Sequence, residues 1–183
     1  MRFSYVARTF FVAFCLLGTI FLVGCSANKI NEYKGREPEF KPEEYFDGHV
    51  KARAIFENRN GKVTREFTGD FRGDWDGESL TIDERLEYKS GKTKERTWVF
   101  EKEGENEYRL SAENIIGEGR GTAMGNAMHL EYTTAVDVDG STWNLTADDW
   151  MYRQGEKTVI NRTTLTYWWL KAGELTIVYR KME

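Results

Sequence analysis

Apolar and polar residues alternate with a period of two along most of the chain beyond residue 48. Between residues 50 and 56 every even position is apolar, whereas positions 51 and 53 are basic. Successive side chains on a β-strand point to opposite faces, so this pattern predicts strands that bury one face. Asn60-Gly61, the strongest short hairpin signal, comes next, and the alternation resumes at Val63. No amphipathic helical segment of useful length interrupts the pattern, which therefore predicts an all-β domain.

Five turn signals predict which residues face each other across neighbouring strands. They stand at Asn60-Gly61, at 89–91, at 139–140, at Gly155-Glu156 and at Ala172-Gly173. Loop length sets the register of each hairpin. The predicted partners are Val50 and Phe71, Ala54 and Phe67, Leu80 and Phe100, Ile82 and Trp98, Glu84 and Arg96, Val136 and Trp143, Thr134 and Leu145, Tyr132 and Ala147, Met151 and Ile160, Asp149 and Arg162, and Trp168 and Ile177.

About ten short strands joined by hairpins make an antiparallel up-and-down meander. A meander of this length hides its edge strands best by closing, which predicts a lipocalin-like barrel over residues 42–183. A two-sheet β-sandwich is the alternative, because hairpin register identifies neighbouring strands but not closure. The aromatic share of 14% can supply the core of one such domain.

The first 24 residues have the features of an export signal. Arg2 and Arg8 precede an apolar run over 10–23 that is short for a transmembrane span. The run ends in Leu22-Val23-Gly24-Cys25, which resembles the bacterial lipobox. The resemblance implies cleavage in front of Cys25 and acylation of its thiol, and several acyl chains anchor a protein stably to a membrane. A transmembrane anchor with an incidental cysteine is the alternative.

Residues 25–41 are polar and show no sustained periodicity, so we expect a tether between the lipid and the domain. Ser26 follows the cysteine, and by resemblance to Gram-negative lipoproteins this favours the periplasmic face of the outer membrane. Loss of the basic leader makes the formal net charge more negative than −4, which disfavours nucleic acid as a partner. Cys25 would be the only cysteine left after cleavage, so no internal disulfide is expected.

Several stretches resemble a family of bacterial lipoproteins catalogued as domain of unknown function family 3833. They are Phe40 to Gly48 (FKPEEYFDG), Gly61 to Arg65 (GKVTR), Gly73 to Gly77 (GDWDG), Gly117 to Ala127 (GEGRGTAMGNA), Asp148 to Met151 (DDWM) and Asn161-Arg162. The resemblance covers nearly all of the domain and implies a lipocalin-like fold. It transfers no activity and no catalytic residue, because the family has no assigned function.

The residue inventory disfavours most enzyme chemistries. His49 and His129 are the two histidines, and the register places the latter on the outer face, so a histidine-rich metal site is not expected. No Gly-x-Ser-x-Gly motif occurs, and acylation would remove the thiol of Cys25 as a nucleophile. Asp148 and Asp149 point to opposite faces of a strand and cannot act together on one substrate. We therefore expect no cofactor, no metal and no catalytic residue.

Glycines over 117–125 share one face of a predicted strand. Gly117, Gly119 and Gly121 leave that face without side chains, so space remains inside the barrel. One interpretation is an apolar cavity for a ligand. Its lining from other strands would include Trp98, Tyr132, Leu145 and Trp168. The alternative is that bulky side chains pack onto the bare backbone or that the glycines let the barrel bend.

Two pairs of opposite charges fall on the predicted inner face, Glu84 with Arg96 and Asp149 with Arg162. The first functional hypothesis is a lipid-anchored, non-enzymatic barrel that binds or shields a small apolar ligand, such as a fatty-acyl or lipid molecule. The alternative is an envelope accessory protein that has a filled barrel and acts through its surface on another envelope component. An enzyme acting on lipid or cyclic substrates inside the barrel is the third hypothesis.

Overall fold

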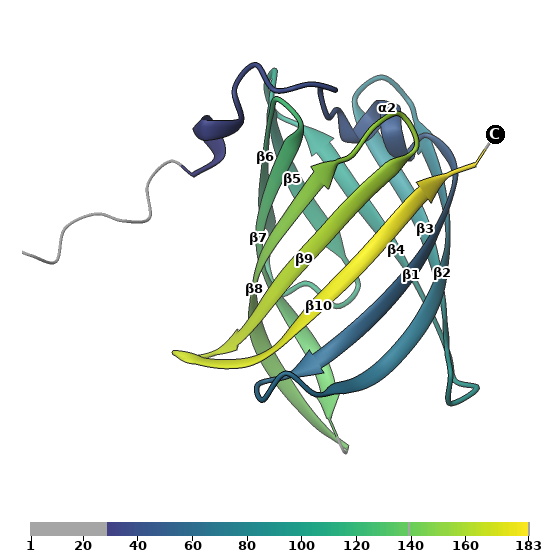
Figure 1. Cartoon of the computed structure of the whole chain (residues 1–183), viewed down its shortest axis with the longest axis vertical. Helices are drawn as coiled ribbons and strands as arrows, with labels where there is room; N and C mark the ends of the chain where they lie inside the picture. Colours follow the sequence, from purple (N-terminus) through teal and green to yellow (C-terminus); the bar gives the residue numbers. More distant parts are fainter. Residues whose placement is uncertain (1–28, 139, 183) are drawn as a thin grey trace, which may run out of the picture.

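The computed structural model describes residues 29–138 and 140–182, which form a β-barrel with helical segments at one end (Figure 1). The 3-10 turn η1 (Ile30–Tyr33) and the helix α2 (Pro42–Phe46) precede the strands. The strands are β1 (Gly48–Asn58), β2 (Val63–Trp75), β3 (Ser79–Tyr88), β4 (Thr93–Lys102), β5 (Glu107–Ala112), β6 (Gly119–Met124), β7 (Ala127–Val138), β8 (Ser141–Arg153), β9 (Thr158–Tyr167) and β10 (Leu170–Lys181). The predicted signal segment and Cys25 lie outside the described residues. Within the described ranges, no helix is long and apolar enough to cross a membrane.

Pairing of the first strand with the last closes the barrel. Each strand pairs antiparallel with its sequence neighbours, and β1 also pairs with β10 over Val50–Asn58 and Gly173–Lys181. Closure leaves no open sheet edge among the described strands, so the barrel is confirmed over the sandwich. Burial alternates along the strands as a period of two predicts. On β3, for example, Leu80, Ile82 and Leu86 are buried.

Three of the five turn signals predict the register correctly, in the hairpins β1–β2, β3–β4 and β7–β8. In the β3–β4 loop Gly91 has a φ of +81°, the left-handed conformation that glycine adopts without strain. Across this loop the Tyr88 amide donates to the Lys92 carbonyl at 2.9 Å. The resulting register places Glu84 directly opposite Arg96.

The β8–β9 hairpin differs from the prediction by one residue. Gly155, with a φ of +98°, begins a loop that the Gln154 amide closes by donating to the Thr158 carbonyl at 2.8 Å. This loop holds one residue more than the predicted Gly155-Glu156 turn. Met151 therefore lies opposite Asn161 instead of Ile160.

The shift by one residue reverses the face on which each β9 side chain lies. Asp149 on β8 lies opposite Thr163, and Arg162 lies opposite Trp150. The Arg162 side chain is 60% exposed on the outer face, where its Nε donates to Glu174 Oε1 at 3.2 Å. The predicted internal pair of Asp149 with Arg162 is therefore wrong.

The last hairpin turns at Trp168-Trp169, earlier than the predicted turn at Ala172-Gly173. Trp168 itself adopts a φ of +58° and is 76% exposed, so its predicted interior position is wrong. Gly173 lies at a register shift in β10, where a Cβ atom would overlap the ring of Phe56. Close packing against the neighbouring strand, rather than a turn, explains this glycine.

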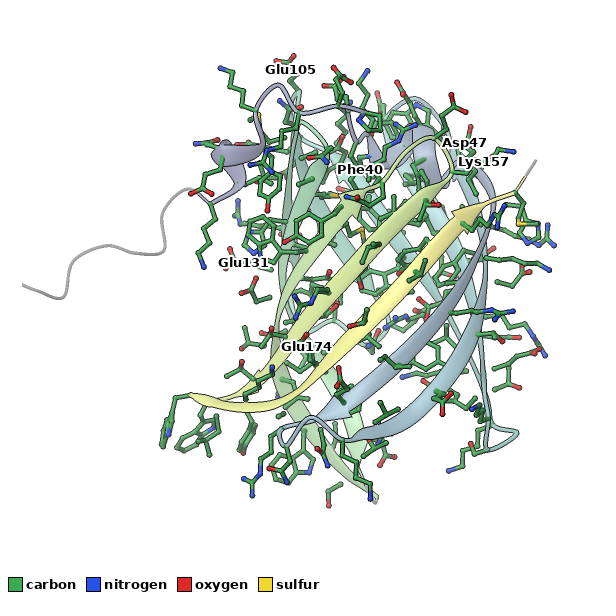
Figure 2. All side chains as sticks on the ribbon, viewed as in Figure 1. Phe40, Asp47, Glu105, Glu131, Lys157 and Glu174 are labelled. Atoms are coloured by element: carbon green, nitrogen blue, oxygen red, sulfur yellow. The ribbon has the colours of Figure 1, made fainter. Side chains whose placement is uncertain are left out.

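The helix α2 and the residues in front of it close one end of the barrel (Figures 1 and 2). Pro42 begins the helix, where its missing amide hydrogen costs nothing. Phe40, Tyr45 and Phe46 are buried, and the ring of Phe46 packs edge-on against Tyr179 with a centroid distance of 5.3 Å. These aromatic side chains act as an apolar plug.

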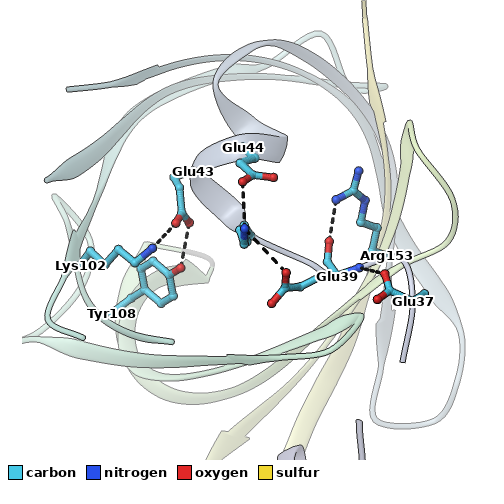
Figure 3. A network of polar contacts seen from close by, with 8 residues as sticks. Glu37, Glu39, Glu43, Glu44, Lys102, Tyr108 and Arg153 are labelled. Atoms are coloured by element: carbon cyan, nitrogen blue, oxygen red, sulfur yellow. Dashed lines mark hydrogen bonds and ion pairs between the residues drawn. The ribbon is translucent and has the colours of Figure 1, made fainter. Parts of the chain in front are cut away.

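A buried carboxylate fastens this plug to the barrel wall. Glu43 of α2 accepts a hydrogen bond from the Tyr108 hydroxyl at 2.8 Å and forms an ion pair with Lys102 (Figure 3). Burial opposes ionisation of Glu43. The hydrogen bonds from Lys102, the backbone and Tyr108, together with the charge of Lys102, outweigh burial and lower the pKa of Glu43. The charged form is thus the one held in place.

Residues 29–41, predicted as part of a tether, lie against the barrel. The ring of Tyr33 in η1 is 5.9 Å from that of Trp150 on the outer face of β8. Further along, the Phe40 amide donates to the Gly125 carbonyl at 2.7 Å, and Arg153 donates to the Glu39 carbonyl at 2.6 Å (Figure 3). This part of the segment belongs to the folded unit.

Candidate ligand-binding site

A chamber of about 380 Å³ occupies the barrel interior at the end opposite α2. It lies inside the end of the barrel that carries the hairpin loops β1–β2, β3–β4, β7–β8 and β9–β10 (Figure 1). Most of its wall is apolar and comes from the inner faces of the strands, including Phe67, Leu86, Val136, Leu145, Leu165 and Ile177. The volume falls within the roughly 300–1,000 Å³ of typical small-molecule sites.

A buried ion pair forms one side of the chamber floor. Arg96 Nη2 donates to Glu84 Oε2 at 2.9 Å, while Arg96 Nε lies 2.9 Å from Glu84 Oε1 without hydrogen-bond geometry. Trp98 Nε1 donates to the same Oε2 at 3.0 Å, and the guanidinium carbon stands 4.4 Å from the Trp98 ring centre. Burial alone would lower the pKa of Arg96, but Glu84 more than offsets this and raises it. The predicted pairing of these two charges is confirmed.

A second polar cluster surrounds Asp149, which is 5% exposed. The carboxylate accepts hydrogen bonds from the Tyr132 hydroxyl at 3.1 Å and from the Asn161 side-chain amide. Burial raises the pKa of Asp149 to about 6, although the hydrogen bonds from Asn161, Tyr132 and Thr163 favour its charged form. A small void of about 50 Å³ lies between this cluster and the Glu84 pair, deeper than the chamber.

Two cations on the chamber wall were missed by the sequence analysis. Lys94 lies on the same face of β4 as Arg96, and Arg65 reaches the wall from β2. Burial, and secondly repulsion from Arg96, lower the pKa of Lys94. The Arg65 guanidinium carbon is 5.7 Å from the centre of the Phe56 ring. Among the described residues, neither cation has a carboxylate within ion-pair distance, so both remain available to a ligand.

The predicted cavity beside the glycines is filled. Gly117 precedes β6, with a φ of +72°. A Cβ atom at Gly119 would lie 2.9 Å from Tyr132 Cβ, and one at Gly121 would lie 2.7 Å from Leu130 Cδ2. Neighbouring side chains thus pack onto the bare backbone, which was the structural alternative to a cavity.

The other predicted lining residues are divided between three places. Tyr132 and Leu145 line the chamber, and Trp98 lies beside the deeper void. Trp168 is outside the barrel. The residues predicted around one cavity therefore do not form a single site.

The outer face carries the histidine that the register predicted there. His129 lies opposite Trp150 and stacks on it with a centroid distance of 4.3 Å. Its Nε2 is 2.8 Å from Asp148 Oδ1. Over residues 29–138 and 140–182, no group of three or more His, Cys, Asp or Glu side chains could hold a metal ion.

The barrel is similar to a solved structure of the S-type phycobiliprotein lyase CPES from Guillardia theta. The TM-score is 0.55 at 12% sequence identity, and the match covers 77% of this chain and 91% of that chain. At this identity the likeness shows the fold alone. No curated protein matches the sequence. The model of a family described as "Protein of unknown function (DUF3833)" matches residues 19–181, and the chain therefore belongs to that family.

Proposed function

We propose that the barrel binds one small amphipathic ligand, an apolar chain with an acidic group such as a fatty acid, in the chamber at its open end. The observation that carries this proposal is the apolar chamber whose wall holds two cations, Lys94 and Arg65, with no carboxylate of the described residues within ion-pair distance. An open chamber of about 380 Å³ does not fit the alternative of a filled barrel that acts only through its surface.

The charges of the chamber favour an acidic ligand over a neutral one. The charge of Arg96 is compensated by Glu84, whereas Lys94 and Arg65 have no carboxylate partner within reach in the described chain. A ligand carboxylate near Lys94 would relieve the repulsion between that ammonium group and Arg96. Hydrogen bonds between charged groups are about twice as strong as neutral ones.

The likeness to a phycobiliprotein lyase is a likeness of fold, and it agrees with a barrel that binds a small ligand. The class of ligand rests on the residues of this chain, because the identity of 12% carries no site from one protein to the other. The third hypothesis, an enzyme, would need a reacting group, and the nearest candidate acid, Asp149, lies beside the small void that is deeper than the chamber.

Photo-labelling tests the proposal on the full chain in its membrane. A palmitate analogue with a diazirine on the acyl chain should label peptides of β1, β7 and β9 that line the chamber. Unlabelled palmitate should compete, and hexadecanol, which has the same chain without the acid, should compete less. Lys94→Leu should weaken binding roughly tenfold or more, since a hydrogen bond to a charged group contributes about 1.5–3 kcal/mol.

Lys92→Leu is the matched control, because Lys92 is exposed in the β3–β4 loop and does not line the chamber. It should leave labelling unchanged. Labelling confined to the outer face, or equal competition by acid and alcohol, would contradict an acidic ligand held in the chamber.

The same proposal includes attachment of the barrel to the periplasmic face of the outer membrane through acylated Cys25. The support is Leu22-Val23-Gly24-Cys25 at the end of an apolar run. Cys25→Ala, or inhibition of the lipoprotein signal peptidase by globomycin, should change processing. The alanine variant should also lose the acyl chains that would hold the barrel in the membrane fraction. A Cys25→Ala protein that is processed normally and stays in that fraction would refute the anchor.

A further inference from the structure

The tip of the β9–β10 hairpin exposes three consecutive apolar residues. Trp168 and Trp169 are each 76% exposed and Leu170 is 56% exposed. Trp168 also has a φ of +58°, a conformation that large side chains adopt at an energetic cost. Neither the exposure nor the backbone conformation stabilises the barrel. The tip is therefore suited to contact another surface outside the barrel.

The tip stands at the entrance to the chamber. The hairpin that carries it also supplies Leu165, Ala172 and Leu175 to the chamber wall. A surface that covers the tip would therefore lie next to the opening through which an apolar ligand enters or leaves.

Two exposed basic residues stand beside the tip. Because β1 pairs with β10, the β1–β2 loop is the neighbour of the β9–β10 hairpin, with Asn58 opposite Gly173. Arg59 and Lys62 in this loop are exposed, and no described carboxylate lies within ion-pair distance of either. The β1–β2 loop thus places two exposed positive charges beside the apolar tip.

We propose that the tip and the β1–β2 loop dock on an anionic lipid bilayer. Tryptophan side chains prefer the interface between headgroups and acyl chains, where an apolar ring and its polar N–H are both satisfied. Lysine and arginine next to that interface bind anionic headgroups. Two exposed indoles next to two exposed cations fit an anionic bilayer better than they fit a neutral protein surface.

The position of the N-terminal segment agrees with a barrel whose β9–β10 tip faces the membrane. In the view of Figure 1, η1 and the β9–β10 tip project on the same side of the barrel, at its closed and open ends respectively. A barrel tilted onto this side brings both the segment that follows the proposed anchor and the tip toward one bilayer. The docking proposal rests on the tip and the loop and does not require the chamber to be occupied.

Quenching of tryptophan fluorescence by brominated lipids tests the docking. The full chain is incorporated into vesicles of phosphatidylcholine and phosphatidylglycerol with brominated acyl chains. Bromine quenches only indoles that enter the bilayer, so Trp168→Phe with Trp169→Phe should remove most of the quenching. Trp75→Phe is the matched control, since Trp75 ends β2 at the α2 end of the barrel, and it should leave the quenching unchanged.

The charge dependence is measured in the same assay. The double variant Arg59→Gln with Lys62→Gln should show less quenching than the parent in vesicles that contain phosphatidylglycerol. In pure phosphatidylcholine it should show the same quenching as the parent. Added salt should reduce the quenching of the parent in the phosphatidylglycerol vesicles. The proposal is overturned if the parent shows no quenching, or if quenching is the same without Trp168 and Trp169. It is also overturned if acrylamide cannot reach these indoles in the absence of vesicles, because a second copy of the chain then covers the tip.

Discussion

Arg96→Ala should destabilise the folded protein by about 3–5 kcal/mol, because it leaves a buried carboxylate without its countercharge. The Glu84 side chain is 4% exposed, so in the folded protein its charge is balanced by the guanidinium and not by solvent. Trp98 Nε1, at 3.0 Å, would remain as a hydrogen-bond donor to Glu84. A single neutral donor stabilises a buried charge far less than an ion pair with a hydrogen bond does.

Arg162→Ala is the matched control for this change. The same residue type is removed, but Arg162 is 60% exposed on the outer face and pairs there with Glu174. Exposed pairs contribute about 0–1 kcal/mol, so the loss should stay within that range. Urea unfolding followed by fluorescence gives both values, provided that the dependence of the unfolding free energy on urea is the same for the parent and the two variants.

A double variant separates the loss of charge balance from the loss of packing. Glu84→Gln added to Arg96→Ala removes the unpaired carboxylate, so it should recover part of the stability that the single change costs. A loss below about 1 kcal/mol for Arg96→Ala, or one equal to that of Arg162→Ala, would refute a buried, mutually dependent pair.

Three further substitutions test the interior and the plug. Burial raises the pKa of Asp149 from its ordinary value of 3.8 to about 6, so the folded state binds a proton on this carboxyl more tightly than the unfolded state does. The parent protein should therefore lose stability as the pH rises from about 4 to about 6. Asp149→Asn should lack this loss in urea unfolding across pH. Gly121→Leu should cost about 1–3 kcal/mol, because a Cβ atom there would already lie 2.7 Å from Leu130 Cδ2, and a higher melting temperature would contradict the filled wall. Lys102→Met should cost about 1–3 kcal/mol by leaving Glu43 without its cation, and hydrogen exchange in α2 should become faster.

The barrel could be predicted from sequence where turn chemistry and alternation agree. Gly91 follows two polar residues between two alternating stretches, and the register that it implies was correct to the residue. Gly155 gave a register wrong by one, because a glycine marks a left-handed position without stating how many residues complete the loop. Gly173 was misleading for a different reason: its lack of a side chain accommodates Phe56 from β1, a contact between distant parts of the chain.

The site was predictable in part for the same reasons. Glu84 and Arg96 were paired from the register alone, and Lys94 lies on the same face two residues earlier, so alternation would have identified it. The position of the chamber could not be predicted, because free space depends on side chains from many strands at once. At Gly121 the space is taken by Leu130 and Met128 from the next strand.

The pairing of β1 with β10 has a consequence for how the chamber comes into existence. Among the described strands it joins the only neighbours that are distant in sequence, while the others can pair as soon as consecutive segments are made. Pairing of distant segments requires a large loss of chain entropy, so this ladder is expected to form late in folding. Until then the barrel is an open sheet with two exposed edges, and the interior has no wall between its first and last strands. If the barrel binds a ligand as proposed, the chain can hold it only after β10 has paired with β1.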